Sequence, residues 1–144
     1  MQLQLGRRAD YAIRAAVDLA GHYGDGQRRK ARAISHEMSI PKSYVPQILA
    51  ELVRAELAVS MAGRDGGYAL AREPNLITLL DVVRSVKGET ISASCVLRGG
   101  PCPRDELCAV HIPLAKAQEA LLDSLETTSL ADLVAIDLPV QADS

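Results

Sequence analysis

Residues 31–55 read ARAISHEMSIPKSYVPQILAELVRA, and this stretch decides the fold class. A short helical pattern runs from about Arg32 to Met38, and a second one runs from Tyr44 to Ala55 with its apolar residues on one face. The polar segment 39–43 between them predicts a tight turn. A short helix, a tight turn and a second helix are the parts of a helix-turn-helix.

Pro46 limits where the second helix can begin. Proline is tolerated only in the first turn of a helix, so we expect the N-cap to lie between Lys42 and Val45. Ser43 is the best capping side chain available in this interval.

A small β-hairpin is expected directly after the helix-turn-helix. The hydrophobic period changes to two at Val59–Met61 and again at Tyr68–Leu70, and the glycines between these runs allow a tight turn. Arg64 falls at the tip of this turn. A helix-turn-helix followed by a hairpin with a basic tip is the layout of a winged helix.

Helical patterns account for most of the remaining chain. They cover residues 9–23, residues 78–86 behind a capping-box-like Thr78-Leu-Leu-Asp81, residues 112–125, and a last short helix capped by Ser129. The expected fold is mainly α with a small β-hairpin, a winged helix-turn-helix plus a long helix. The expected divisions are a winged-helix domain at 1–88, a cysteine-containing loop at 89–110, the long helix and a short C-terminal helix at 111–136, and a frayed tail at 137–144.

Five side chains are candidates for contact with double-stranded DNA. In a winged helix the second helix of the motif enters the major groove and its N-terminal side chains reach bases or phosphates. Gln47 is the best base reader because its amide can pair with adenine. The other candidates suit phosphate or minor-groove contacts, and they are Lys42, Ser43, Tyr44 and Arg64.

Composition and charge are compatible with a DNA-binding protein. The formal net charge is −2, but residues 1–72 carry a net charge of +4 and residues 73–144 a net charge of −6. The basic half could face phosphates while the acidic half faces away. No apolar run is long enough to span a bilayer and no secretory signal is evident, which predicts a cytoplasmic protein without a membrane partner.

Three cysteines lie close together in the second half of the chain. They are spaced as Cys95-x6-Cys102-x5-Cys108, and His111 follows the last of them after two intervening residues. Thiolates prefer zinc or the iron of an iron–sulfur cluster. Structural zinc sites have tighter Cys-x2–4-Cys knuckles, so the wide spacing favours a cluster. A metal-free thiol–disulfide switch stays open on the spacing alone.

Taken together, these motifs resemble the bacterial iron–sulfur regulators that include IscR, NsrR and RirA. The resemblance spans residues 3–135, nearly the whole chain. It rests on the segments 10–15, 40–45, 47–49, 66–72, 78–83 and 128–133 together with the three cysteines. Two departures are notable: the gap between Cys95 and Cys102 differs by one residue from the usual patterns, and Glu56 stands where a glycine is common.

The resemblance implies a homodimer built on the long helix at Ile112–Leu125, bound to near-palindromic promoter DNA. It also implies a [2Fe-2S] or [4Fe-4S] cluster that senses redox state, iron or nitric oxide. Two residues match positions of a fourth ligand: His111, as in IscR-like proteins, and Asp10 contributed by the other subunit, as in NsrR-like proteins. His111 is preferred because it is local in the sequence.

The predicted function is therefore a transcriptional regulator, most simply a repressor, whose promoter binding is modulated by an iron–sulfur cluster. The alternatives are a cluster-free thiol-switched regulator and, from a different class, an iron–sulfur electron carrier. An electron carrier would need neither a recognition helix nor a wing. An enzyme is not expected, because the sequence offers no nucleophile–base pair, phosphate-binding loop or carboxylate pair in a credible setting.

Overall fold

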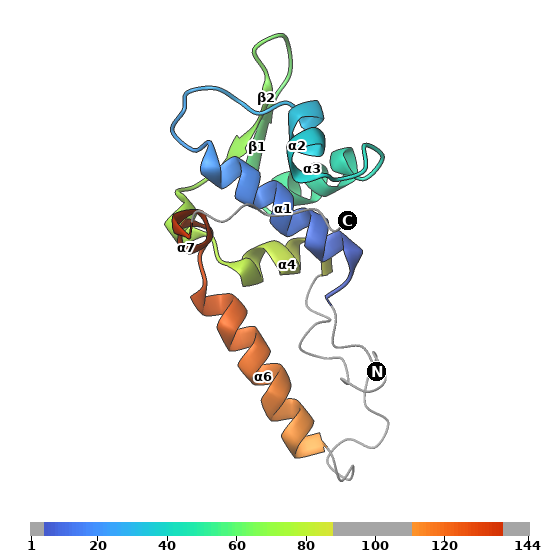
Figure 1. Ribbon diagram of the computed structural model, residues 1–144, viewed down its shortest axis with the longest axis vertical. Helices are drawn as coiled ribbons and strands as arrows, with labels where there is room; N and C mark the ends of the chain where they lie inside the picture. The colour runs from blue at the N-terminus through green and yellow to red at the C-terminus, as the bar shows by residue number, and fades with distance from the viewer. Residues whose placement is uncertain (1–4, 88–110, 137–144) are drawn as a thin grey trace.

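A computed structural model describes residues 5–87 and 111–136, and these form a winged helix from which one long helix extends (Figure 1). The elements, in chain order, are α1 (Arg7–Gly21), α2 (Ala31–Met38), α3 (Val45–Arg54), β1 (Ala58–Met61), β2 (Gly67–Leu70), the 3-10 helix η1 (Pro74–Leu76), α4 (Leu79–Lys87), α6 (His111–Thr127) and α7 (Leu130–Ala135). The expected class, mainly α with a small hairpin, is confirmed. No helix in the described ranges combines the length and the apolar character that crossing a membrane requires.

The buried side chains of the main core are aliphatic, and they come from α1, α2, α3, α4, α7 and the two strands β1 and β2. Ile34, Ile48, Leu49 and Leu52 are fully buried, and the alanine stripe of α1 lets the neighbouring helices approach closely. Leu130 of α7 is also fully buried in this core. The last short helix therefore completes the winged helix, although about forty residues separate it from α4 in the sequence.

Two capping boxes lie beside one another where α4 and α7 begin. The backbone N–H of Thr78 donates to Asp81 Oδ2 at 3.0 Å, and the N–H of Asp81 donates back to Thr78 Oγ1 at 3.1 Å. Ser129 and Asp132 make the same pair of bonds at the start of α7. The two turns are joined by backbone hydrogen bonds, Leu79 N–H to Thr128 O and Leu130 N–H to Ile77 O, each 2.9 Å long. The predictions of both capping motifs are confirmed.

The predicted Ser43 cap is wrong. Tyr44 is the N-cap residue of α3, and no side chain accepts a hydrogen bond from the first turn. Pro46 occupies the second helical position, so one of the N–H groups that a capping side chain would satisfy is absent. The backbone instead turns into the helix through a bond from Tyr44 N–H to Pro41 O at 2.9 Å.

A Schellman motif ends α3 and leads into the wing. The N–H of Glu56 donates to Val53 O at 3.0 Å, and the N–H of Leu57 donates to Leu52 O at 2.9 Å. Glu56 adopts a left-handed conformation with φ 63°, in which glycine would be less strained than a residue with a Cβ. The chain can then reverse immediately into β1.

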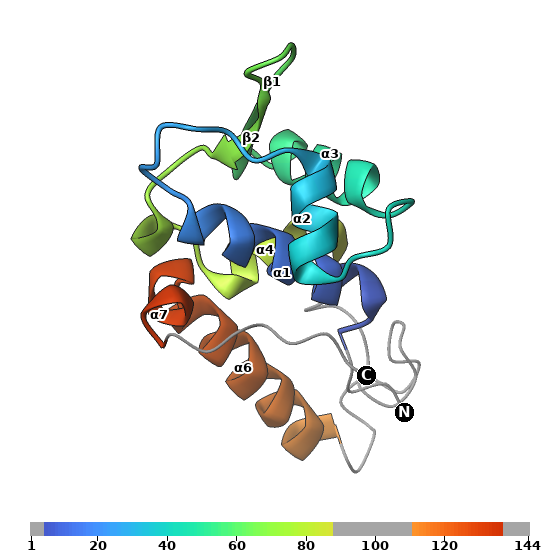
Figure 2. The ribbon, with the colours of Figure 1, turned by 45° about the horizontal axis from the view of Figure 1, so that its top comes forward.

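The wing is the antiparallel pair β1 and β2, with Ala58 opposite Leu70 and Met61 opposite Gly67. Its tip turn comprises Gly63 to Gly66, closed by a bond from Gly66 N–H to Gly63 O at 3.1 Å. A Cβ on Gly66 would lie 2.1 Å from Met61 O, so the close approach of the two strands requires glycine there. Figure 2 shows the wing projecting beyond the helices, at the end of the molecule opposite α6.

Candidate nucleic-acid interface and cofactor site

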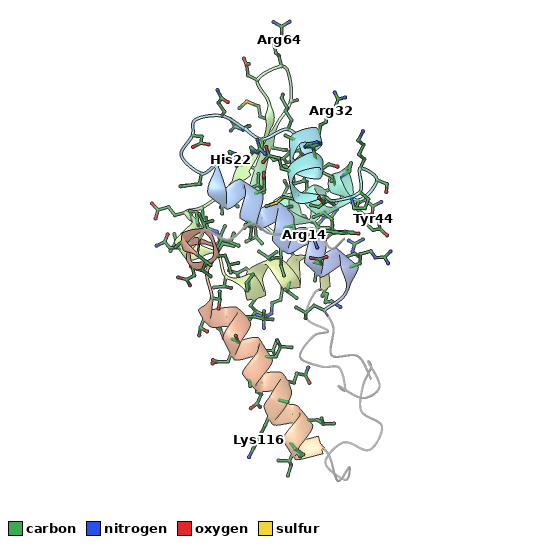
Figure 3. All side chains as sticks on the ribbon, in the orientation of Figure 1. Arg14, His22, Arg32, Tyr44, Arg64 and Lys116 are labelled. Carbon is green, nitrogen blue, oxygen red and sulfur yellow. The ribbon has the colours of Figure 1, made fainter. Side chains whose placement is uncertain are left out.

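The start of α3 and the wing tip present the predicted DNA-contacting residues at the surface. Lys42, Ser43, Gln47 and Arg64 are exposed, and Tyr44 is partly buried. In Figure 3, Arg64 marks the tip of the wing and Tyr44 lies near the start of α3. The fold therefore places both predicted contact regions on the winged-helix end of the molecule.

Contacts with α1 hold the candidate recognition helix α3 in place. The rings of Tyr11 and Tyr44 are tilted against each other with their centroids 5.1 Å apart. Arg8 Nη2 lies 3.2 Å from Glu51 Oε1, and Arg54 Nη1 lies 3.0 Å from the other oxygen of that carboxylate. The ring contact and the Arg8–Glu51 pair thus join α1 to the start and the middle of α3.

Two basic residues near this surface were not singled out from the sequence. Arg32, in the first turn of α2, is exposed and projects between the wing and the recognition helix in the view of Figure 3. Lys30 is the N-cap residue of α2 and reaches the wing tip, where its Nζ donates to Gly63 O at 3.2 Å and Arg64 O at 2.8 Å. Their only sequence signal was the basic run that begins at Arg28.

A buried ion pair anchors the segment that carries Lys30. Arg29 donates from Nε to Asp18 Oδ2 at 3.0 Å and from Nη2 to Asp18 Oδ1 at 3.1 Å. The same guanidinium lies 2.8 Å from Glu37 Oε2. The hydrogen bond to Asp18, with the negative charges of both carboxylates, raises the pKa of Arg29 despite its partial burial. This part of the basic run therefore serves packing, because its charge is neutralised inside the protein.

Asp10, one of the two candidates for a fourth cluster ligand, lies in the first turn of α1. Its side chain is 49% exposed, and its Oδ1 accepts a hydrogen bond from Arg14 Nε at 2.9 Å. Arg14 is buried and its Nη1 also donates to Met38 O, at the end of α2, over 3.4 Å. The carboxylate is thus accessible to solvent and is linked through one arginine to the turn of the helix-turn-helix.

The other predicted ligands fall at the edge of the described residues or beyond it. Cys95, Cys102 and Cys108 lie outside the described residues, as do the whole segment 89–110 and the tail 137–144. Helix α6 begins at His111, immediately after this segment in the chain. Within the ranges 5–87 and 111–136, no three side chains of metal-binding type gather into a site.

Comparison with known proteins places this architecture in a family. A family model described as "Rrf2: Iron-dependent Transcriptional regulator" matches residues 5–136. The chain belongs to the Rrf2 family. The resemblance inferred from the sequence motifs is therefore confirmed, and so is the prediction that the protein is a transcriptional regulator and not an enzyme.

Individual Rrf2 relatives support both the sequence match and the fold. The HTH-type transcriptional regulator IscR of Sodalis glossinidius is 30% identical over 132 residues, which cover 92% of this chain and 79% of the relative. The structure of T. potens IscR is similar with a TM-score of 0.77 and 26% identity, covering 100% of this chain and 95% of that one. CymR, described as the global cysteine regulator of B. subtilis, shares the fold with a TM-score of 0.77 at 23% identity, covering 95% of this chain and all of its own.

Proposed function

We propose that this Rrf2 protein binds promoter DNA as a homodimer, and that an iron–sulfur cluster on its three cysteines sets the affinity. The observation that carries the DNA-binding part is the arrangement of exposed basic and polar side chains on the start of α3, the start of α2 and the wing tip. The cluster part is supported by three closely spaced thiols and by the iron dependence in the family description.

On DNA, the recognition helix and the wing would contact different parts of the duplex. Gln47 would read an adenine in the major groove, since its amide can donate and accept at once. Lys42, Ser43 and Tyr44 would contact phosphates around it, and Arg64 would reach the backbone or minor groove. Arg32 adds a positive charge between these two regions.

Helix α6 supports the homodimer. Its apolar stripe comprises Leu114, Ala117, Leu121 and Leu125, of which Leu125 is buried, Leu114 is partly buried, and Ala117 and Leu121 are exposed. Leu125 is 7% exposed against Leu80 and Val83 of α4, whereas Leu121 is 40% exposed. The same stripe on a second copy would cover the remainder, as in coiled-coil packing of helices. Sedimentation velocity should show a dimer for the wild type and a monomer for Leu121→Glu, with Val134→Glu as a control on an exposed position of α7.

The donor set suits an iron–sulfur cluster. Three thiolates are the ligands that such clusters prefer, and a fourth position can be filled by His111 or by Asp10 of a second subunit. The accessibility of the Asp10 carboxylate is compatible with the second choice. When bound, the cluster would supply a centre whose charge and stability depend on redox state, iron supply or nitric oxide.

Residues of this chain could couple the occupancy of the cluster site to the DNA-binding surface. Arg14 divides its hydrogen bonds between Asp10 and the carbonyl of Met38, which ends the first helix of the motif. If Asp10 were drawn away as a ligand, Arg14 would lose its charged partner and the end of α2 would be held less firmly. Separately, the segment 88–110 connects α4, which packs on α1 and α3, to α6. Both routes would bias the population of dimers whose recognition helices are spaced for DNA.

One experiment tests the coupling. Protein purified anaerobically, with and without its iron, is titrated onto a fluorescent promoter fragment at fixed salt. We expect at least a tenfold difference in Kd between the two forms, and equal affinities would contradict the coupling. An iron-free protein whose binding is intact and is lost only on thiol oxidation would support the thiol switch instead.

The fourth ligand can be assigned with paired variants. Asp10→Ala and His111→Ala are compared by absorption and Mössbauer spectroscopy, with Asp25→Ala and His36→Ala as controls at exposed positions. We expect the cluster spectrum to change in His111→Ala and to stay as in the wild type in the controls. A change confined to Asp10→Ala would transfer the role to the other subunit's carboxylate.

A further inference from the structure

The tip of the wing is fastened to the body of the winged helix by Lys30. This residue precedes α2 and lies 33 positions from Gly63 in the sequence. Its Nζ donates to two consecutive carbonyls of the tip turn, Gly63 O at 3.2 Å and Arg64 O at 2.8 Å. The ammonium group therefore binds the backbone of the residue whose side chain is the candidate DNA probe.

Arg29, the preceding residue, anchors Lys30 to the body. Its backbone pairs with that of Tyr68 in β2 through two bonds of 2.8 and 2.7 Å, and its guanidinium holds Asp18 of α1 and Glu37 of α2. Arg29 thus extends the two-stranded wing by one isolated bridge. We name residues 29 and 30 the wing clamp.

The tip turn itself has little to hold it in one conformation. Gly63 has φ 101°, and a Cβ added there would meet nothing within 4 Å. Strands of four residues, as in this wing, are marginal in water without additional packing. A donor that binds two carbonyls of the turn would reduce the conformational freedom that Arg64 must lose when DNA binds.

We propose that Lys30 is a positioning residue for the wing, which orders the tip so that Arg64 reaches DNA. This inference rests on the proposed contact of Arg64 with DNA. It differs from a direct phosphate contact of Lys30, which the position of this lysine at the rim of the DNA-facing end would also permit. The two roles predict different behaviour, both in the free protein and on DNA.

The first test uses the free protein. Backbone 15N order parameters at residues 63–66 are compared among the wild type, Lys30→Gln, Lys30→Arg and Lys116→Gln. Lys116 lies on α6 at the opposite end of the molecule, so it controls for the loss of one lysine charge (Figure 3). We expect the order parameters of the tip to fall clearly in Lys30→Gln alone and to be largely kept in Lys30→Arg. An unchanged tip in Lys30→Gln would overturn the proposal.

The second test is a double-mutant cycle on promoter DNA with Lys30→Gln and Arg64→Gln. We expect Lys30→Gln to weaken binding about fivefold when Arg64 is present, which is the order expected for an exposed charged contact. It should have little effect, and leave the salt dependence unchanged, when Arg64 is already replaced. Additive losses, with a lower salt dependence in the Arg64→Gln background, would show a direct phosphate contact and overturn the positioning role.

The cycle also separates this inference from the proposed function. If Arg64→Gln alone binds as the wild type does, the wing contact with DNA is wrong, and the positioning role is wrong with it. If Arg64→Gln weakens binding but Lys30→Gln does not, only the positioning role is wrong.

Discussion

The winged helix and α6 contain the same types of aliphatic residue, but they bury them to different extents. In the winged helix, apolar side chains from five helices are buried against one another, and Leu49 and Leu52 are almost wholly inaccessible. In α6, Leu125 is buried and Leu114 is partly buried, but Ile112 and Leu121 are 65% and 40% exposed. The first region can be stable within one chain, whereas the second would gain its burial from a partner in the proposed homodimer. Stability and assembly should therefore respond to different substitutions.

Truncation of the winged-helix core should have the largest effect on stability. Leu49→Ala removes a fully buried side chain and leaves a cavity, so we expect the free energy of unfolding to fall by about 2–5 kcal/mol. Leu121→Ala on α6 should change the unfolding of the monomer by less than about 1 kcal/mol and weaken the dimer instead. Urea unfolding at two protein concentrations separates the effects. Equal losses at low concentration in both variants would contradict the comparison.

The second-largest effect on stability is expected for the ion pair between Asp18 and Arg29. Asp18→Asn removes the buried charged partner of Arg29 and leaves it only the exposed carboxylate of Glu37, and we expect a loss of about 3 kcal/mol, because the Asp18 side chain is only 2% exposed. Asp10→Asn changes the same chemical group in the pair with the buried Arg14, but the Asp10 side chain is 49% exposed, so we expect a loss of less than about 1 kcal/mol. Thermal unfolding of both variants is the measurement. A smaller loss in Asp18→Asn than in Asp10→Asn would show that the ion pair between Asp18 and Arg29 of the wing clamp does not stabilise the fold.

A glycine in the wing should have an intermediate effect. Gly66→Ala forces a Cβ against the carbonyl of Met61, and we expect a loss of roughly 1–3 kcal/mol together with weaker DNA binding. Gly21→Ala, at the end of α1, meets nothing within 4 Å and should be neutral or slightly stabilising. Chemical denaturation and DNA titration of this pair test whether the wing depends on its close strand approach. Wild-type behaviour of Gly66→Ala would rule that out.

The smallest expected effect is a gain in stability. Glu56 occupies a left-handed conformation at the end of α3, and Glu56→Gly removes its strain for a gain of about 0.5–1 kcal/mol. Glu56→Ala keeps a Cβ at the same φ and should show no such gain. The melting temperatures of the two variants are compared with that of the wild type. An equal rise in both would show that the gain comes from the lost charge and not from relief of backbone strain.

The local signals of this chain were sufficient for most of the fold. Helical periodicity, Pro46, the two capping boxes and the turn glycines each act over a few residues, and the predicted elements correspond to observed ones within a few residues at their ends. The Ser43 cap failed because Pro46 removes the N–H group that makes such a cap worthwhile. The order of motifs was also specific enough to indicate the family, which the match over residues 5–136 confirms.

Tertiary structure decided the relations between distant segments. The contacts of Lys30 with the wing tip, of Arg14 with Met38 and of Leu130 with the core join residues that are far apart in the chain, so no periodicity or short motif announces them. The sequence alone determined that three cysteines are close along the chain between two predicted helices, and that the candidate recognition helix and wing carry polar and basic side chains. Only the fold decided which basic side chains face solvent and which, like that of Arg29, are paired with a buried carboxylate, because burial depends on packing between elements.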